Sequence, residues 1–107
     1  MKDVIISGGF NVYPSDVEAA LVAHPAIHEC VVFGCPDEKW GEAVQAAIEL
    51  REGAVASAED IVAFAKSQIG SVQAPKQVHF VDSLPRSAVG KVQRREVRAL
   101  IERAEET

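Results

Sequence analysis

The chain has 107 residues, 48% of them hydrophobic, and a formal net charge of −5 at pH 7. This length and hydrophobic content are typical of one small domain with a packed core, which excludes a disordered chain. The acidic balance argues against general binding to nucleic acids or anionic membranes, because both need a positively charged surface. No apolar run approaches the roughly 20 residues that span a bilayer, and the start lacks the features of a signal peptide. We therefore expect a cytoplasmic protein.

The hydrophobic pattern predicts an α+β fold: a three-stranded sheet flanked by helices, plus an N-terminal β-hairpin. The hairpin occupies residues 4–13, with Gly8 and Gly9 at its turn. A helix should follow, because residues 15–18 (SDVE) match the capping-box pattern, and Pro25 should end it.

The middle of the chain predicts two strands joined by a polar loop. Residues 27–33 are apolar on both faces, which favours a central strand covered on both sides. Residues 34–42 (GCPDEKWGE) read as a loop, and alternating apolar residues predict a second strand over 44–50.

The last part of the chain predicts helix, strand, loop and helix. Residues 57–60 (SAED) cap a helix that Gly70 should end. A connector leads to a third strand over 77–82, and a loop then precedes a final helix. The final helix would bury an apolar stripe made of Val97, Leu100, Ile101 and Ala104.

The cysteines and histidines predict neither a disulfide nor a metal site. Cys30 and Cys35 are an odd number of residues apart in a strand, so their side chains should point to opposite faces. His24 and His28 have helical spacing, but Pro25 between them should end the helix and remove a shared face.

Lys91 is the most distinctive charged residue, because it follows Gly90 on the loop before the final helix. The pair is not a phosphate-binding P-loop, which needs glycine where Pro85 stands and serine or threonine where Val92 stands. A lysine beside a flexible glycine suits a mobile point charge that reaches a carboxylate or phosphate. The alternative is that residues 91–98 are only a solvated basic helix face.

Two further features leave alternatives open. Gly8 and Gly9 could be turn residues only, or could expose bare backbone where a thin ligand passes. Trp40, the only tryptophan, could be an interface or ligand platform, or could cover the core.

Four segments together carry a family resemblance: residues 2–14 (KDVIISGGFNVYP), 24–25 (HP), 34–42 and 84–91 (LPRSAVGK). In this order they resemble the C-terminal domain of AMP-forming acyl-CoA synthetases, in the adenylate-forming superfamily with luciferases and peptide-synthetase adenylation domains. The resemblance covers nearly the whole chain, residues 1–107. It implies that a large N-terminal domain, absent from this sequence, binds ATP with Mg²⁺ and a carboxylic acid and forms an acyl-adenylate. The small domain then rotates, and coenzyme A attacks to give acyl-CoA and AMP.

The resemblance also implies roles for individual residues. Lys91 matches the lysine that contacts the carboxylate and ATP phosphates during adenylation, and Lys2 matches the hinge. Gly8 and Gly9 match backbone along the pantetheine tunnel.

Two more residues match positions near coenzyme A. Lys76 matches a lysine that meets the coenzyme A nucleotide in some relatives, and Trp40 matches a tryptophan that either packs or lies near coenzyme A. Val72 and Ala74 depart from those relatives, which have an aromatic residue and an arginine there.

The sequence leaves three functions open. The chain could be the lid of a ligase, with a fatty acid as the expected substrate, and inactive alone. It could be a free-standing interaction module that binds a synthetase or carrier protein. It could also be the lid of an adenylation domain that loads a carrier protein. Met1 in the place of a linker residue favours a piece of a longer protein.

Overall fold

A computed structural model describes residues 4–84 and 94–105. The elements, in chain order, are β1 (Ile5–Ser7), β2 (Phe10–Val12), α1 (Pro14–Leu21), β3 (Ile27–Asp37), β4 (Gly41–Leu50), α2 (Ala58–Gln73), β5 (Gln77–Phe80) and α3 (Arg94–Glu105). The predicted α+β class is confirmed. Among the described residues, no helix is long and apolar enough to cross a membrane.

The hairpin is part of the main sheet rather than a separate unit. β1 pairs with β2 and also with the start of β4, where Ser7 lies opposite Gly41. β3 and β4 form a long antiparallel pair, and β5 runs parallel to β4. Within residues 4–84 and 94–105, the sheet therefore has five strands rather than three strands plus an appended hairpin.

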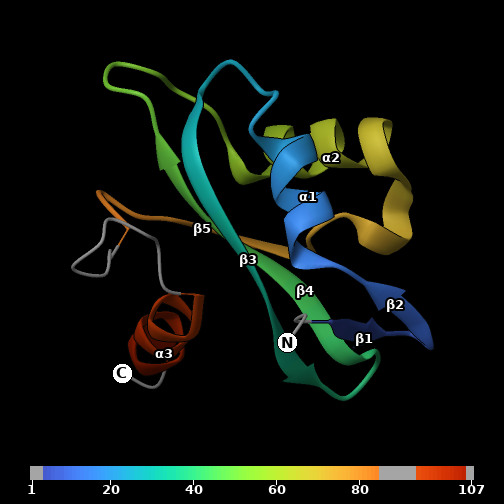
Figure 1. Cartoon of the computed structure of the whole chain (residues 1–107). Coiled ribbons are helices and arrows are strands. Elements are labelled where there is room, and N and C mark those ends of the chain that lie inside the picture. The colour runs from blue at the N-terminus through green and yellow to red at the C-terminus, as the bar shows by residue number, and fades with distance from the viewer. Residues whose placement is uncertain (1–3, 85–93, 106–107) are drawn as a thin grey trace.

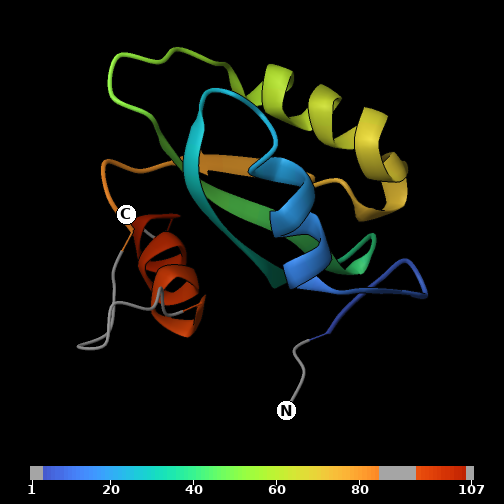
Figure 2. The same cartoon turned by 45° about the horizontal axis from the view of Figure 1, so that its top comes forward.

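The strand predicted at the centre of the sheet is covered on both faces, but it does not lie at the centre. In the described part of the chain β3 pairs only with β4, whereas β4 pairs with β1, β3 and β5. α1 and α2 cover one face of the sheet and α3 covers the other (Figures 1 and 2). The apolar residues on both faces of β3 are explained by the helices that cover both faces of the sheet. They do not require a neighbouring strand on each edge of β3.

Two buried clusters correspond to these two layers. The cluster under α1 and α2 includes Val17, Leu21, Cys30, Val32, Val44, Ile48, Ile61 and Ala65. The cluster under α3 consists of Val31, Phe33, Cys35, Ala47, Leu84, Val97 and Ile101. The alternation of side chains along β3 divides its residues between the two clusters, as the sequence predicted.

The two predicted capping boxes had different outcomes. At α2 the box is present: Ser57 Oγ accepts from Asp60 N at 3.1 Å, and Ser57 N donates to Asp60 Oδ2 at 3.3 Å. At α1 the prediction is wrong, because the helix begins at Pro14 with Tyr13 as N-cap and no side-chain cap. Glu18 contacts β3 instead, where its Oε2 accepts from Val32 N at 2.8 Å.

The other differences concern where elements end. α1 ends at Leu21, before Pro25, and Gly70 (φ +82°) interrupts α2, whose span continues to Gln73. The loop predicted over residues 34–42 is mostly strand, since β3 continues to Asp37 and β4 begins at Gly41. In α3 the stripe is only partly buried, because Leu100 is 45% exposed.

Cys30 and Cys35 are buried in different clusters, on opposite faces of β3, as their spacing predicted. Burial, and secondarily the nearby Glu18 carboxylate, raises the pKa of the Cys30 thiol to about 12. Because the thiolate is the nucleophilic form, Cys30 is an inert core residue.

Candidate functional site

The turn of the β1–β2 hairpin has the backbone conformation that only glycine adopts easily. Gly8 has φ +58° and Gly9 has φ +84°, as a two-residue type I′ turn requires. An added Cβ at Gly8 would lie 3.0 Å from Trp40 Cε3, whereas one at Gly9 would meet no described atom within 4 Å. Gly8 therefore lies close against the Trp40 ring, and Gly9 presents open backbone.

The β3–β4 turn holds this hairpin in place. Gly8 N donates to Trp40 O at 2.8 Å, and Ile6 N donates to Glu42 Oε1 at 2.9 Å. Asp37 Oδ2 shapes the turn by accepting from Trp40 N at 2.9 Å. The sequence reasoning gave Asp37 and Glu42 no role, because their partners are backbone groups that residue spacing does not reveal.

The Trp40 ring lies between the hairpin and two lysines. It is partly buried and packs against the backbone of Gly8. Lys76 Nζ lies 4.9 Å from the ring centroid and Lys39 Nζ lies 5.1 Å from it, which is within cation–π range. Trp40 belongs to neither core cluster. Its position fits a platform beside the hairpin better than a cover for the core.

Lys76 joins this group from the connector before β5. Its backbone N donates to Val44 O at 2.7 Å, and its Nζ donates to Ser71 O at 2.5 Å. Partial burial, and secondarily the positive charge of Lys66, lowers the pKa of the Lys76 ammonium. An anion bound beside these two lysines would relieve the second effect.

Lys66 was missed by the sequence reasoning. Together with Lys76 it lines a shallow groove of about 480 Å³ between α2 and the start of β5, whose walls also include Glu59 and Val62. Ten positions separate the two lysines, so only the packing of α2 beside β5 reveals that they share a groove.

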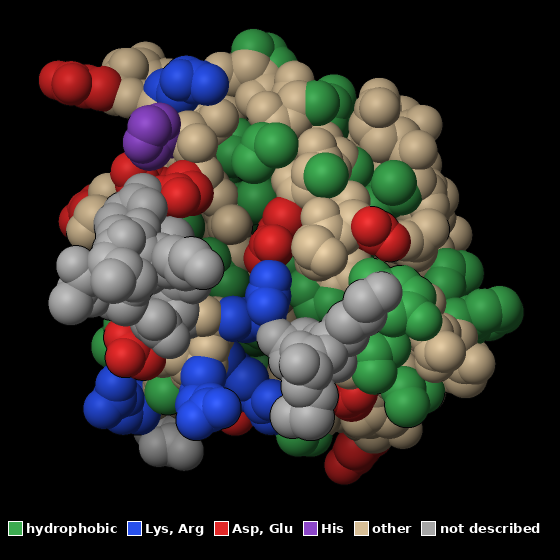
Figure 3. Space-filling model, viewed as in Figure 1, with side chains coloured by type: hydrophobic (Ala, Val, Ile, Leu, Met, Phe, Trp, Pro, Cys, Tyr) green, Lys and Arg blue, Asp and Glu red, His purple; other side chains and the backbone are tan. Residues whose placement is uncertain are grey.

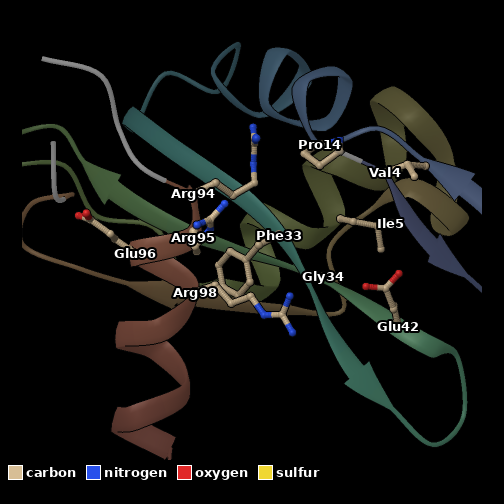
Figure 4. Close-up of a pocket in the computed structure, with 10 residues that line it drawn as sticks. All are labelled: Val4, Ile5, Pro14, Phe33, Gly34, Glu42, Arg94, Arg95, Glu96 and Arg98. Carbon is tan, nitrogen blue, oxygen red and sulfur yellow. The ribbon is translucent and has the colours of Figure 1, made fainter. Parts of the chain in front are cut away.

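A second cleft lies beside the start of α3, which belongs to the basic segment 91–98 noted in the sequence. Arg94, Arg95 and Arg98 line an open cleft of about 570 Å³ that extends to Ile5 and Glu42 at the hairpin end of the sheet (Figure 4). In the space-filling view, basic side chains gather around α3 (Figure 3). Lys2 and Lys91 lie outside the described residues, so their predicted roles remain predictions.

The structure thus brings together four of the six predicted site residues. Gly8 is hydrogen-bonded to Trp40, Gly9 follows it in the same turn, and Lys76 lies over the Trp40 ring. This arrangement combines bare backbone, an aromatic face and a cation, which suits a narrow ligand that carries negative charge.

Known proteins with similar sequences are ligases that are much longer than this chain. The medium/long-chain fatty acid–CoA ligase FadD8 of Mycobacterium tuberculosis is 48% identical over 106 residues, which cover 92% of this chain and 19% of that protein. The long-chain fatty acid–CoA ligase of Bacillus subtilis is 49% identical over 94 residues, 88% of this chain and 17% of that protein. The chain therefore spans about a fifth of the length of the curated relatives that it matches.

A solved structure with a similar fold is also that of an acyl-CoA synthetase. The crystal structure of an acyl-CoA synthetase from Brucella canis superposes with a TM-score of 0.87 and 38% identity, over 95% of this chain and 20% of that one. The family described as the AMP-binding enzyme C-terminal domain matches residues 16–91, which is more than half of the chain. The chain therefore belongs to the family of C-terminal domains of AMP-binding enzymes.

Proposed function

We propose that this chain is the mobile C-terminal domain of an AMP-forming acyl-CoA ligase, which converts a carboxylic acid, ATP and coenzyme A into acyl-CoA, AMP and pyrophosphate. The domain supplies Lys91 to the adenylation step and the β1–β2 hairpin to the thioester step. The observation that carries the proposal is the cluster of Gly8, Gly9, Trp40 and Lys76, described above. A fatty acid is the proposed substrate, because FadD8 and the Bacillus subtilis ligase are named for fatty acids.

The hairpin side of the domain has the properties that a coenzyme A site needs. The pantetheine arm is narrow, and the open backbone at Gly9 lets it pass without meeting a side chain. Phe10 beside the turn is 59% exposed and Ile6 on β1 is 52% exposed, so apolar surface adjoins the backbone. Lys66 and Lys76 supply the positive charge that the nucleotide phosphates of coenzyme A require.

The two half-reactions use two different parts of the domain. The hairpin belongs to the N-terminal end of the chain, whereas Lys91 stands three positions before the first residue of α3 in the sequence. A rigid-body rotation about Lys2 would present one part and then the other to the N-terminal domain, as in hinge-type domain movements. This alternation explains why one small domain serves two chemical steps.

The Lys76→Gln variant tests the nucleotide part of the site. In a full-length ligase that carries this domain, it is expected to raise the KM for coenzyme A by about 3–10-fold, because one charge-assisted contact is lost. The KM values for ATP and the acid should not change, and steady-state kinetics with each substrate varied in turn would measure all three.

Arg51→Gln is the matched control for Lys76→Gln. It removes one positive charge from an exposed residue at the far end of β4. If both variants raised the KM for coenzyme A equally, net charge rather than the groove would be responsible, and the role of Lys76 would be wrong.

The 107-residue chain alone is expected to catalyse no ATP–pyrophosphate exchange. In the proposed function the ATP and acid sites belong to the N-terminal domain, so Lys91 alone has no bound substrate to act on. Exchange of radiolabelled pyrophosphate into ATP, measured with and without a fatty acid, checks this result. Exchange above the rate of a protein-free sample would contradict the proposal that the ATP and acid sites belong to the N-terminal domain.

A further inference from the structure

The β1–β2 hairpin is attached to the main sheet over a very short length. Ser7 on β1 lies opposite Gly41 on β4, and in the described part of the chain these two strands form no other pair. β1 stands between β2 and β4 in the sheet, so β2 reaches β4 only through β1. The position of the hairpin therefore depends on a few hydrogen bonds close to Ser7.

Glu42 supplies a side-chain hydrogen bond where the pairing of β1 with β4 stops. One position beyond the Ser7–Gly41 pair, the register of antiparallel strands places Ile6 across from Glu42. There Ile6 N donates to the Glu42 side chain, with 2.9 Å between Ile6 N and Glu42 Oε1. This bond lies two residues before Gly8, at the base of the turn. Because a side chain provides it, a substitution can remove it without changing the backbone.

The Glu42 carboxylate lies against the backbone of β3, where Gly34 leaves room for it. A Cβ added at the buried Gly34 would lie 2.9 Å from Glu42 Oε2 and 3.0 Å from Ile5 Cγ2, both closer than ordinary van der Waals contact. Figure 4 shows the side chains of Ile5 and Glu42 beside Gly34. Ile5 is itself only 3% exposed. Residues of β1, β3 and β4 thus meet at the Glu42 carboxylate, which fixes where it lies.

We propose that Glu42 is a positioning residue for the thioester step, because its carboxylate holds the hairpin and therefore the open backbone at Gly9. This inference rests on the proposed function, in which the pantetheine arm passes Gly9. The thiol reacts only within a narrow range of distances and directions, so a displaced hairpin should reduce rate rather than affinity. The affinity for the coenzyme A nucleotide is assigned to Lys66 and Lys76, which line a separate groove.

The test is Glu42→Ala in a full-length ligase that carries this domain. At saturating coenzyme A, thioester formation from supplied acyl-adenylate is expected to fall about 10–100-fold, since a misplacement of about 1 Å can cost that much. The KM for coenzyme A should change by less than about 2-fold, in contrast to the rise expected for Lys76→Gln. Pyrophosphate exchange, which reports adenylation, should be unchanged, because the hairpin serves the other step.

Glu42→Gln distinguishes the hydrogen bond from the negative charge. Glutamine keeps a carbonyl oxygen that accepts from Ile6 N, and its side chain has nearly the same size and shape. Thioester formation should therefore stay within about 3-fold of the wild-type rate. A rate as low as that of Glu42→Ala would mean that this hydrogen bond does not position the hairpin, and the inference would be wrong.

Glu49→Ala is the matched control, because it removes the same kind of bond from the same strand. Glu49 Oε1 accepts from Leu84 N at 3.1 Å, near the end of β4 that lies away from the Ser7–Gly41 pair. Glu49→Ala should leave thioester formation from supplied acyl-adenylate unchanged. Thermal unfolding of both alanine variants shows how much stability each of them loses.

Each other outcome identifies a separate failure. An equal fall in both half-reactions of Glu42→Ala, or an equal fall in thioester formation in Glu49→Ala, would show that Glu42 only stabilises the fold and would overturn the inference. A raised KM for coenzyme A at an unchanged maximal rate would overturn it too, since Glu42 would then act in binding. Normal thioester formation in Glu42→Ala together with a slow rate in Gly9→Leu would overturn the role of Glu42 alone. Normal thioester formation in Gly9→Leu would instead overturn the proposed function.

Discussion

Replacing Lys91 by alanine in a full-length ligase that carries this domain is expected to slow acyl-adenylate formation by about 10²–10³-fold. Negative charge shifts between the carboxylate and the ATP phosphates in this step, and a correctly placed cation in a water-poor site stabilises it. Thioester formation from supplied acyl-adenylate should be unchanged, because the domain presents its hairpin rather than Lys91 in that step. Pyrophosphate exchange and a coupled coenzyme A assay would measure the two half-reactions separately.

Arg95→Ala is the control that separates a specific role of Lys91 from a general basic surface. Arg95 is an exposed residue in the first turn of α3, only four positions from Lys91. Its loss removes the same charge from the same patch. If Arg95→Ala slowed adenylation as much as Lys91→Ala, the alternative of a merely solvated basic helix would be supported, and Lys91 would have no individual role.

The local parts of the fold could be predicted because their signals lie within a few residues of each other. The glycine pair at residues 8–9 predicted the hairpin, and the alternation along β3 predicted which residues face each layer. The S-x-x-D box at residues 57–60 predicted the start of α2. In each case the sequence pattern and the structure that it causes occupy the same short segment.

The features that were missed depend on contacts between distant segments. Ser15 and Glu18 match a capping box, but Glu18 binds Val32 and Arg94, which no local pattern could indicate. The hairpin joins β4 through Ser7 and Gly41, 34 positions apart, and this pairing makes the hairpin part of the main sheet.

In the candidate site too, some residues could be predicted from the sequence, whereas others depend on contacts between distant segments. Gly8, Gly9 and Trp40 were candidates from the residues themselves, Lys76 came from the family resemblance, and the structure places the four together. Lys66 became visible only from the packing of α2 beside β5. The residues that hold the site, rather than those that would touch a ligand, were hardest to predict, because their partners are mostly backbone groups.

Gly9→Leu is expected to have the opposite effect to Lys91→Ala, and the structure explains why Gly9 is a better target than Gly8. A side chain at Gly8 would collide with the Trp40 ring and displace the hairpin, so a loss of activity there would have two explanations. A side chain at Gly9 would project into space that the described protein leaves open. In the proposed function the pantetheine arm occupies that space, so thioester formation should fall by about 10²-fold or more while pyrophosphate exchange is unchanged.

Gly53→Leu is the matched control, because it carries the same backbone strain without lying near the hairpin. Gly53 has φ +78° against +84° for Gly9, and an added Cβ there would also meet no described atom within 4 Å. Both leucines should therefore cost about 1–2 kcal/mol of stability for a left-handed backbone, and thermal unfolding would show similar shifts. Only Gly9→Leu should block the attack of coenzyme A. Equal thioester rates in the two variants would mean that strain explains any loss, and that pantetheine does not pass along the hairpin turn.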